Sequence, residues 1–204
     1  MSLFVLARAL AIQIGGGIGA GVGLVRTSDK MKKYVVLAIG NVLLSDDGVG
    51  AKVLAALEAH SSWPADIRLV DGGTLSFSLE AELDDCAGLV VVDASRLGTQ
   101  PGTVECMEGA AMDHLLQKTG RSVHEVGLAD VLDVARLTKR LPSHRALIGI
   151  EPETIDWGET LSPAVHAAVP LAADRVLGLL ATWRGEPSIT VSLESLLTVP
   201  SATP

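Results

Sequence analysis

Residues 34–58 constrain the fold of this chain more than any other stretch. A short apolar run at residues 35–39 is followed by two adjacent carboxylates, Asp46 and Asp47, and then by apolar residues at helical spacing over residues 50–59. This order predicts a buried strand, a loop and an amphipathic helix. The two acidic residues are therefore expected in the loop that follows the first strand.

Strand-like and helical patterns alternate along the rest of the chain. The predicted strands cover residues 35–39, 67–70, 89–92, 103–107 and 146–150. The predicted helices cover residues 50–59, 75–83, 110–117 and 127–138, and a last helix runs from Ser162 towards Trp183, with Pro170 expected to kink or split it. Strands that are nearly all apolar predict a mostly parallel five-stranded sheet covered on both faces, a three-layer αβα sandwich. Residues 103–107 follow Asp93 too closely for a helical crossover, so that strand is expected to be antiparallel.

The length of 204 residues predicts one domain, here placed at residues 31–185. Residues 1–30 are apolar and glycine-rich, but Arg8 interrupts the apolar run of a signal peptide and the glycines disfavour a membrane helix. Met31 followed by two lysines resembles an ordinary start. Residues 1–30 are therefore expected to be a dispensable extension, and residues 186–204 a peripheral tail.

The charge and the cysteines limit the partners and the compartment. A net charge of −8 argues against nucleic acid and anionic membrane as partners. An aromatic content of 3% also argues against a surface of aromatic side chains that stack on the bases of single-stranded nucleic acid. Cys86 and Cys106 stand in no ligand spacing and are expected to be partly buried free thiols. This usage favours a reducing cytoplasm.

Polar residues follow the predicted strands repeatedly, where ligands bind in open α/β sheets. They are Asn41, Asp46 and Asp47 after the first strand, Asp71, Gly72 and Gly73 after the second, Asp93 after the third, and Glu151, Pro152 and Glu153 after the last. Each acid also has a structural alternative. One of the first pair, with Asp46 favoured, is expected to cap the following helix, and Asp71 before two glycines is typical of a turn. Asp93 ends a buried strand and needs a partner or a function.

Among the five histidines, His124 stands out because it lies at the entry to the helix predicted at residues 127–138. Ser122 and Glu125 have the spacing of a capping box, which would place His124 in the first helical turn. An imidazole near two carboxylates suits a divalent metal such as zinc or nickel, although this spacing has no motif statistics. The other histidines are expected at the surface. The chain contains no GxSxG, HExxH or Walker A sequence.

From about residue 34 to residue 180 the chain resembles the nickel-iron hydrogenase maturation proteases. The segments that carry this resemblance, in the family's order, are AIGNVLLSDDGVG (38–50), VDGGT (70–74), VVDAS (91–95), PGTV (101–104), HEVGLADVL (124–132) and GIEPETIDWGETLSPAV (149–165). Residues 1–30 and the tail lie outside it. The resemblance implies a twisted sheet between helices.

The resemblance also implies an endopeptidase that removes a C-terminal extension from a hydrogenase large-subunit precursor after nickel has been inserted. The family's metal-binding positions correspond here to Asp47, Asp93 and His124, with nickel carried by the precursor. In some members the first of these is Glu, so Asp47 has a shorter reach. Asp71, Gly72, Gly73, Glu151 and Asn41 are expected to support the site, with Asp46 as a cap or supporting group. The protease is expected to be a cytoplasmic monomer.

The chemistry of cleavage stays open at this point. Asp47, Asp93 and His124 could bind nickel that polarises the scissile carbonyl or activates water, as in a metal-assisted peptidase. Alternatively a carboxylate could act as general base, as in an aspartic-type peptidase, with Asp47 and Asp93 as the catalytic residues. A different hypothesis is a nickel-dependent chaperone that holds the large subunit without cutting it. A flavin or nucleotide domain is disfavoured because the loops are acidic.

Overall fold

The computed structural model describes residues 33–59, 63–74, 83, 85–117 and 123–186, and the side chains of residues 123–126 are not among those described. The predicted N-terminal extension, the helix predicted at residues 75–83 apart from Leu83, and nearly all of the predicted tail lie outside these residues. So does the capping residue Ser122.

The strands form one five-stranded sheet in the order β2-β1-β3-β5-β4. They are β1 (Lys33–Ala38), β2 (Ile67–Asp71), β3 (Cys86–Ala94), β4 (Val104–Glu108) and β5 (His144–Ile150). The pairs β1–β2, β1–β3 and β3–β5 are parallel, and β4 pairs with β5 in the antiparallel direction. Both the mostly parallel sheet and its antiparallel strand are therefore confirmed.

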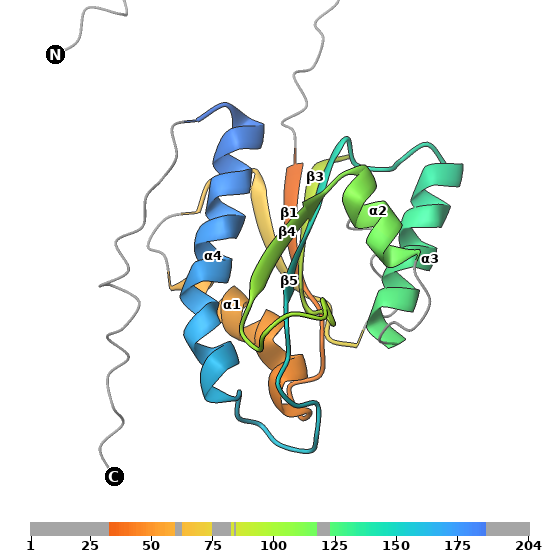
Figure 1. Cartoon of the computed structure of the whole chain (residues 1–204). Coiled ribbons are helices and arrows are strands. Elements are labelled where there is room, and N and C mark those ends of the chain that lie inside the picture. The colour runs from red at the N-terminus through yellow and green to blue at the C-terminus, as the bar shows by residue number, and fades with distance from the viewer. Residues whose placement is uncertain (1–32, 60–62, 75–82, 84, 118–122, 187–204) are drawn as a thin grey trace, which may run out of the picture. The chain divides into compact units, whose positions relative to one another are not determined.

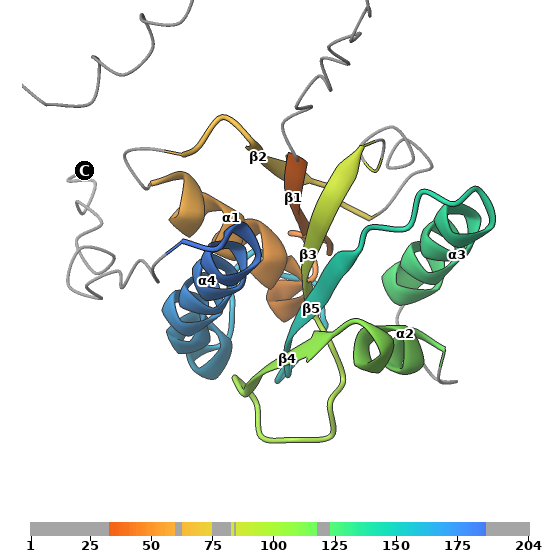
Figure 2. The same ribbon diagram turned by 90° about the horizontal axis from the view of Figure 1, so that it is seen from above.

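Helices cover the two faces of the sheet (Figure 1). The short 3-10 turn η1 (Ser45–Gly48) leads into α1 (Val49–Glu58), which packs beside α4 (Pro163–Arg184) on one face. The helices α2 (Ala110–Leu116) and α3 (Val123–Leu137) pack together on the other face. The view along the sheet in Figure 2 shows the three layers directly.

Alternate residues of the central strands feed two separate cores. Val90 and Val92 of β3 join α1 and α4 in one core, whereas Leu89 and Val91 join α2 and α3 in the other. All four are at most 1% exposed. Because successive side chains of a strand point to opposite faces, a strand buried on both faces must be apolar throughout, which explains the continuous apolar runs in the sequence.

The last helix begins as the sequence predicts. The hydroxyl of Ser162 accepts a hydrogen bond from the N–H of Val165 at 3.4 Å, and Pro163 occupies the first helical position. Pro170 does not split the helix, which runs as one element to Arg184. Of the described helices, α4 alone is long and apolar enough to cross a membrane, yet Val176 is fully buried in the core against the sheet. This burial is what the core helix of a folded domain shows.

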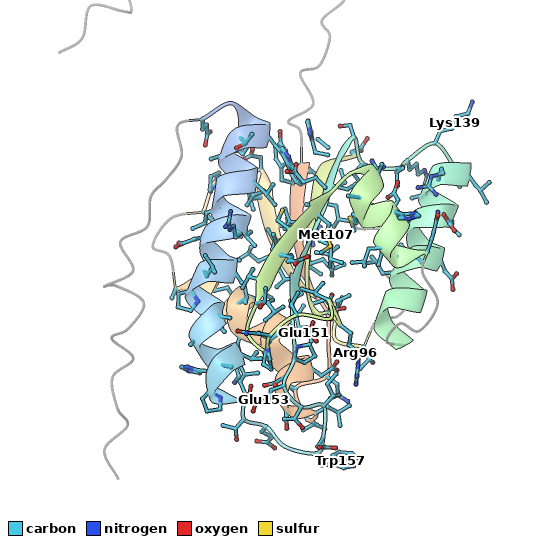
Figure 3. The ribbon with its side chains drawn as sticks, in the orientation of Figure 1. Arg96, Met107, Lys139, Glu151, Glu153 and Trp157 are labelled. Carbon is cyan, nitrogen blue, oxygen red and sulfur yellow. The ribbon has the colours of Figure 1, made fainter. Side chains whose placement is uncertain are left out.

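The parallel strands all end at the same edge of the sheet, and the loops that follow them gather there. Figure 3 shows Arg96, Glu151, Glu153 and Trp157 at this end of the fold, with Lys139 at the opposite end. The cysteines are free thiols; Cys86 is buried as expected, but Cys106 is exposed on the edge strand β4, so the prediction of partial burial is wrong for it.

Candidate active site

Asp47 lies buried in the 3-10 turn between β1 and α1. Its carboxylate oxygen Oδ2 accepts a hydrogen bond from the N–H of Asn41 at 2.7 Å, and its exposed fraction is 2%. A buried carboxylate that is oriented by a backbone donor has a fixed direction for its remaining lone pairs. The predicted loop position is therefore confirmed, and Asn41 touches Asp47 directly.

Gly40 makes this geometry possible. Its φ is +129°, and a side-chain carbon at Gly40 would overlap the backbone carbonyl oxygen of Asp47. Only glycine combines that backbone angle with such a close approach. Its N–H also donates to the carbonyl oxygen of Gly73 at 2.8 Å, which joins the loops after β1 and β2. Gly40 is not among the predicted site residues, although its place between a buried strand and the acidic loop is a signal for a structural role.

Asp93 lies at the carboxyl end of β3 and is 0% exposed. Its neighbours in the strand show that it faces the α2–α3 layer, because Leu89 and Val91 point there and side chains alternate. The turn η1, which carries Asp47, contacts β3. Asp93 pairs with Gly149 of β5 in the sheet. Gly149 has no side chain, and the side chains of Ser95 and Leu97 pack closely against it. Asp47 and Asp93 are thus two buried carboxylates at one edge of the sheet.

His124 is the second residue of α3, in its first turn, which is the position predicted from the capping-box spacing. In Figure 1 the N-terminal end of α3 lies at the carboxyl end of the parallel strands, on the face towards which Asp93 points. The backbone therefore brings His124 to the same end and face as Asp93, while its side chain is outside the described part. Among the described side chains no group of three metal-binding residues is close enough to hold an ion.

Asp46 has a role that differs from the expected one. The prediction that it caps α1 is wrong, because the N-cap of α1 is Gly48, which has no side-chain hydrogen bond. Asp46 is instead 0% exposed and reaches across to the loop between β5 and α4. Its Oδ2 accepts from the N–H groups of Glu153 and Thr154 at 2.9 and 3.0 Å, and its Oδ1 accepts from Ser162 at 2.6 Å.

These hydrogen bonds also set the charge of Asp46. Burial is the largest single influence and raises the pKa of Asp46, but the backbone donors of Ser162, Thr154 and Glu153, with the Ser162 side chain, together hold that pKa below its ordinary value. Asp46 is therefore ionised at neutral pH, and its carboxylate holds two loops together. The adjacent pair of acids divides into Asp47, which faces the site, and Asp46, which organises its frame.

Glu151 organises a further loop of the same edge. Its Oε2 accepts hydrogen bonds from the N–H groups of Leu97 and Thr99 at 2.6 and 3.1 Å. Its backbone pairs with Gly102 and Thr103, so it also fixes the turn before β4. Asp71 forms the turn that the sequence indicates, because its Oδ1 accepts from the N–H of Gly73 at 2.9 Å. Gly72 packs closely: a side-chain carbon there would lie 2.8 Å from Cδ1 of Leu37.

The charges at this edge are strongly one-sided. In the described loops at the carboxyl ends of the parallel strands, Arg96 is the only basic residue. The acidic residues of the same loops, together with those at the ends of β2 and β3, are Asp46, Asp47, Asp71, Asp93, Glu151, Glu153, Asp156 and Glu159. Such an edge attracts cations, including a metal ion or a positively charged peptide segment.

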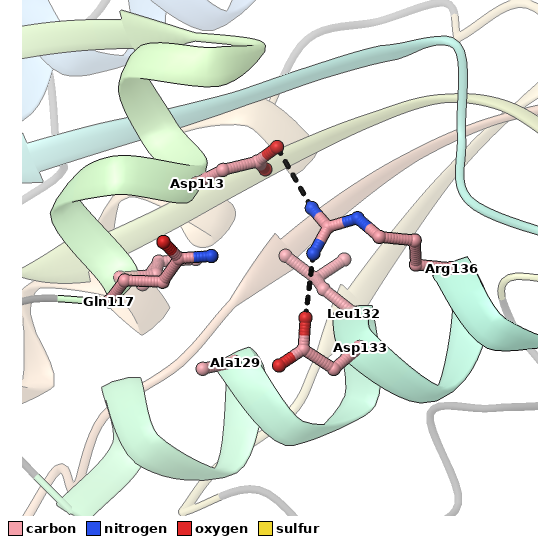
Figure 4. A pocket seen from close by; sticks show the side chains of 7 residues that line it. Asp113, Gln117, Ala129, Leu132, Asp133 and Arg136 are labelled. Atoms are coloured by element: carbon pink, nitrogen blue, oxygen red, sulfur yellow. Dashed lines mark hydrogen bonds and ion pairs between the residues drawn. The ribbon is translucent and has the colours of Figure 1, made fainter.

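A small pocket between α2 and α3 lies elsewhere and contains none of these acids (Figure 4). Arg136 bridges it with ion pairs to Asp113 at 3.0 Å and Asp133 at 2.7 Å. Arg145 of β5 also binds Asp113 at 2.6 Å. The pocket therefore belongs to an ion-pair network that joins two helices to the sheet.

Known proteins resemble this chain in sequence and in fold. The family model for the hydrogenase maturation protease HycI matches residues 51–179. The chain is 33% identical over 173 residues to the hydrogenase expression/formation protein HupD of Rhodobacter capsulatus, covering 84% of this chain and 82% of HupD. It is 32% identical over 149 residues to the hydrogenase 2 maturation protease of Escherichia coli, covering 72% of this chain and 90% of that protein.

A solved structure agrees with these relatives. The hydrogenase maturating endopeptidase HybD from E. coli superposes with a TM-score of 0.70 at 31% identity, covering 74% of this chain and 93% of HybD. Its α/β fold is the one described here, which confirms the predicted fold class. The family model and these relatives together show that the chain belongs to the hydrogenase maturation proteases and is a peptidase.

Proposed function

We propose that this peptidase removes the C-terminal extension of the large-subunit precursor of a nickel-iron hydrogenase. The observation that supports this most directly is the pair of buried carboxylates, Asp47 and Asp93, brought to one edge of the sheet by η1 and the end of β3. Membership of the hydrogenase maturation proteases supplies the class of substrate. Work in the cytoplasm as a monomer is part of the same proposal, and the two free thiols are compatible with it.

Nickel enters this proposal as part of the substrate. Asp47 and Asp93 would supply two oxygen ligands, and the imidazole of His124 would supply one nitrogen. Oxygen and nitrogen donors of this kind suit a borderline divalent ion, and three of them leave positions for ligands from the precursor. The charge of the edge supports the assignment, because eight acidic residues against Arg96 favour a bound cation. The protease would then recognise only precursor that already carries metal.

The chain's own residues would orient the peptide and hold the proton that cleavage transfers. Asp47 is fixed by Asn41, so it is a suitable general base towards water if the metal only positions the peptide. If the metal activates the water, Asp47 and Asp93 serve as its ligands and no further base is required. Asp46 and Glu151 would hold the surrounding loops in place, because their carboxylates accept hydrogen bonds from backbone N–H groups.

Incubation with nickel-loaded and nickel-free precursor, followed by mass spectrometry of the large subunit, tests the proposal. The nickel-loaded form is expected to lose a C-terminal peptide, and the nickel-free form is expected to stay intact. Asp47→Ala, Asp93→Ala and His124→Ala are each expected to abolish cleavage. Normal trimming by all three variants would refute the site. A wild-type protein that binds the loaded precursor but never shortens it would instead be a chaperone.

A further inference from the structure

Three large apolar side chains stand exposed beside the candidate site. Val42 and Leu43, in the loop after β1, are 48% and 45% exposed, and Trp157, in the loop after β5, is 83% exposed. We call these three residues the apolar lip. Tryptophan at such exposure loses much of its favourable burial energy, so an exposed apolar cluster of this kind usually marks a contact surface.

The two loops of the lip are tied to each other by hydrogen bonds. The N–H of Ser45 donates to the carbonyl oxygen of Gly158 at 2.6 Å. The N–H of Gly158 donates in turn to the carbonyl oxygen of Leu43 at 3.0 Å. The hydroxyl of Ser45 donates to the carbonyl oxygen of Asp156 at 2.9 Å. Together with the bonds of Asp46, these contacts hold the lip in place before any partner arrives. Little ordering is therefore required on binding, which favours affinity.

Hydrogen bonds connect the lip to the carboxylate of Asp47. The N–H of Asn41 binds Oδ2 of Asp47, and Oδ1 of Asn41 accepts a hydrogen bond from the N–H of Leu43 at 3.0 Å. One residue thus spans from the site to the lip. A polypeptide whose scissile bond lies at Asp47 would have to pass close to Leu43.

The border of the lip is acidic. Glu153, Asp156 and Glu159 lie in the same loop as Trp157, and all three are exposed. Figure 3 shows Glu153 and Trp157 at the same end of the fold. An apolar surface with an acidic border complements a segment that presents apolar side chains next to positive charge.

We propose that the apolar lip docks the polypeptide substrate beside its scissile bond, through a segment that carries an apolar side chain flanked by basic residues. This inference rests on the proposed function for the identity of the substrate. The lip would contribute binding rather than chemistry, so its loss should weaken substrate binding and leave the chemical step intact.

Steady-state cleavage of nickel-loaded precursor separates these effects. Trp157→Ala and Leu43→Ser are expected to raise KM about tenfold or more, as loss of an interface anchor does, with kcat changed less than about twofold. The matched controls are Leu137→Ala and Leu171→Ser, since Leu137 is 84% and Leu171 46% exposed. Leu137 ends α3, at the opposite end of the fold near Lys139, and Leu171 lies within α4. Both controls should leave KM unchanged.

Fluorescence gives a readout that does not depend on cleavage. Trp63 and Trp183 are partly buried and packed against the core, so Trp157 is the exposed emitter. Rapid mixing of wild-type protein with nickel-loaded precursor should shift the emission of Trp157 to the blue before any cleavage occurs. Trp157→Phe should abolish this shift and keep KM within about threefold, because the apolar surface is retained.

The failures of the two proposals can be told apart. If wild-type protein does not cut the precursor, the proposed function fails. If wild-type protein cuts it and both lip variants keep the wild-type KM, the docking surface is refuted. A wild-type dimer that Trp157→Ala converts to a monomer, with KM unchanged, would show that the lip binds a second copy instead. A KM that does not rise between about 50 and 300 mM salt would refute the role of the acidic border.

Discussion

The carboxylate of Asp46 accepts a hydrogen bond from the backbone N–H of Ser162, 116 residues further along the chain, at 2.6 Å. The same carboxylate holds the N–H groups of Glu153 and Thr154. One buried anion thus joins the loop after β1 to the loop after β5 and to the start of α4. The position of Asp47, its neighbour in sequence, depends on this frame.

Asp46→Ala should lower the free energy of unfolding by about 3–5 kcal/mol, because three backbone N–H groups lose a charged acceptor and Asp46 is fully buried. Urea unfolding followed by circular dichroism measures this change. Asp46→Asn keeps the shape and one acceptor oxygen, so its loss should be smaller, about 1–3 kcal/mol. Equal stability of Asp46→Ala and wild-type protein would show that the frame does not depend on this residue.

Asp47→Asn should lower kcat by about 100-fold or more, since the amide can serve neither as an anionic ligand nor as a general base. Asp47→Glu restores the carboxylate but adds a methylene in a position that is 2% exposed. It should keep far more activity than Asp47→Asn while costing about 1–3 kcal/mol of stability. The cleavage assay and urea unfolding measure the two effects. A Glu variant as inactive as the Asn variant would make the exact position of the carboxylate, and not its charge, the limiting factor.

The sequence was most informative where burial controls the pattern. Leu89, Val91 and Leu147 are apolar because both faces of the sheet are covered. Such continuous apolar runs predicted where the strands lie and that the sheet is mostly parallel. Because Asp47 and Asp93 follow or end predicted parallel strands, the sequence also predicted that they would lie at the same edge of the sheet. The predicted residue roles at the metal stay predictions.

Contacts between loops that are distant in the chain could not be predicted from the sequence. Asp46 next to a helix start looks like a cap, because a cap is a local bond and its true partners are more than 100 residues away. Trp157 gave no periodic signal, since an exposed side chain in a loop has no partner in its own element. The geometry at Gly40 depends on a carbonyl oxygen that only the folded turn brings near.

Gly40→Ala should destabilise the protein by about 2–4 kcal/mol, because it combines a φ of +129° with an overlap onto the carbonyl oxygen of Asp47. Gly73→Ala is the matched control. Its φ is +49°, and an added side-chain carbon would meet no atom within 4 Å, so only the backbone cost of about 1 kcal/mol is expected. Urea unfolding of both variants gives the difference. Equal losses would mean that the loop moves away from Asp47 without cost.

The acid sensitivity of the fold should depend partly on Asp113. Its hydrogen bond from Arg145, against the opposing effect of burial and with the charges of Arg145 and Arg136, holds the pKa of Asp113 below its ordinary value of 3.8. At pH values between the lowered pKa of the folded state and 3.8, the carboxylate of Asp113 is protonated in the unfolded chain but not in the folded chain. The stabilisation by ionised Asp113 is therefore complete above about pH 4 and is lost as pH falls through the pKa of the folded state. Asp113→Asn should therefore lower the free energy of unfolding at pH 7 by about 1–3 kcal/mol, and this free energy should fall less steeply below pH 4 than in the wild-type protein.

The control is Asp133→Asn. Asp133 forms an ion pair with Arg136 but is 58% exposed, so its substitution should cost less than about 1 kcal/mol. Urea unfolding from pH 7 to pH 2 measures both, and an unchanged slope in Asp113→Asn would contradict the assignment.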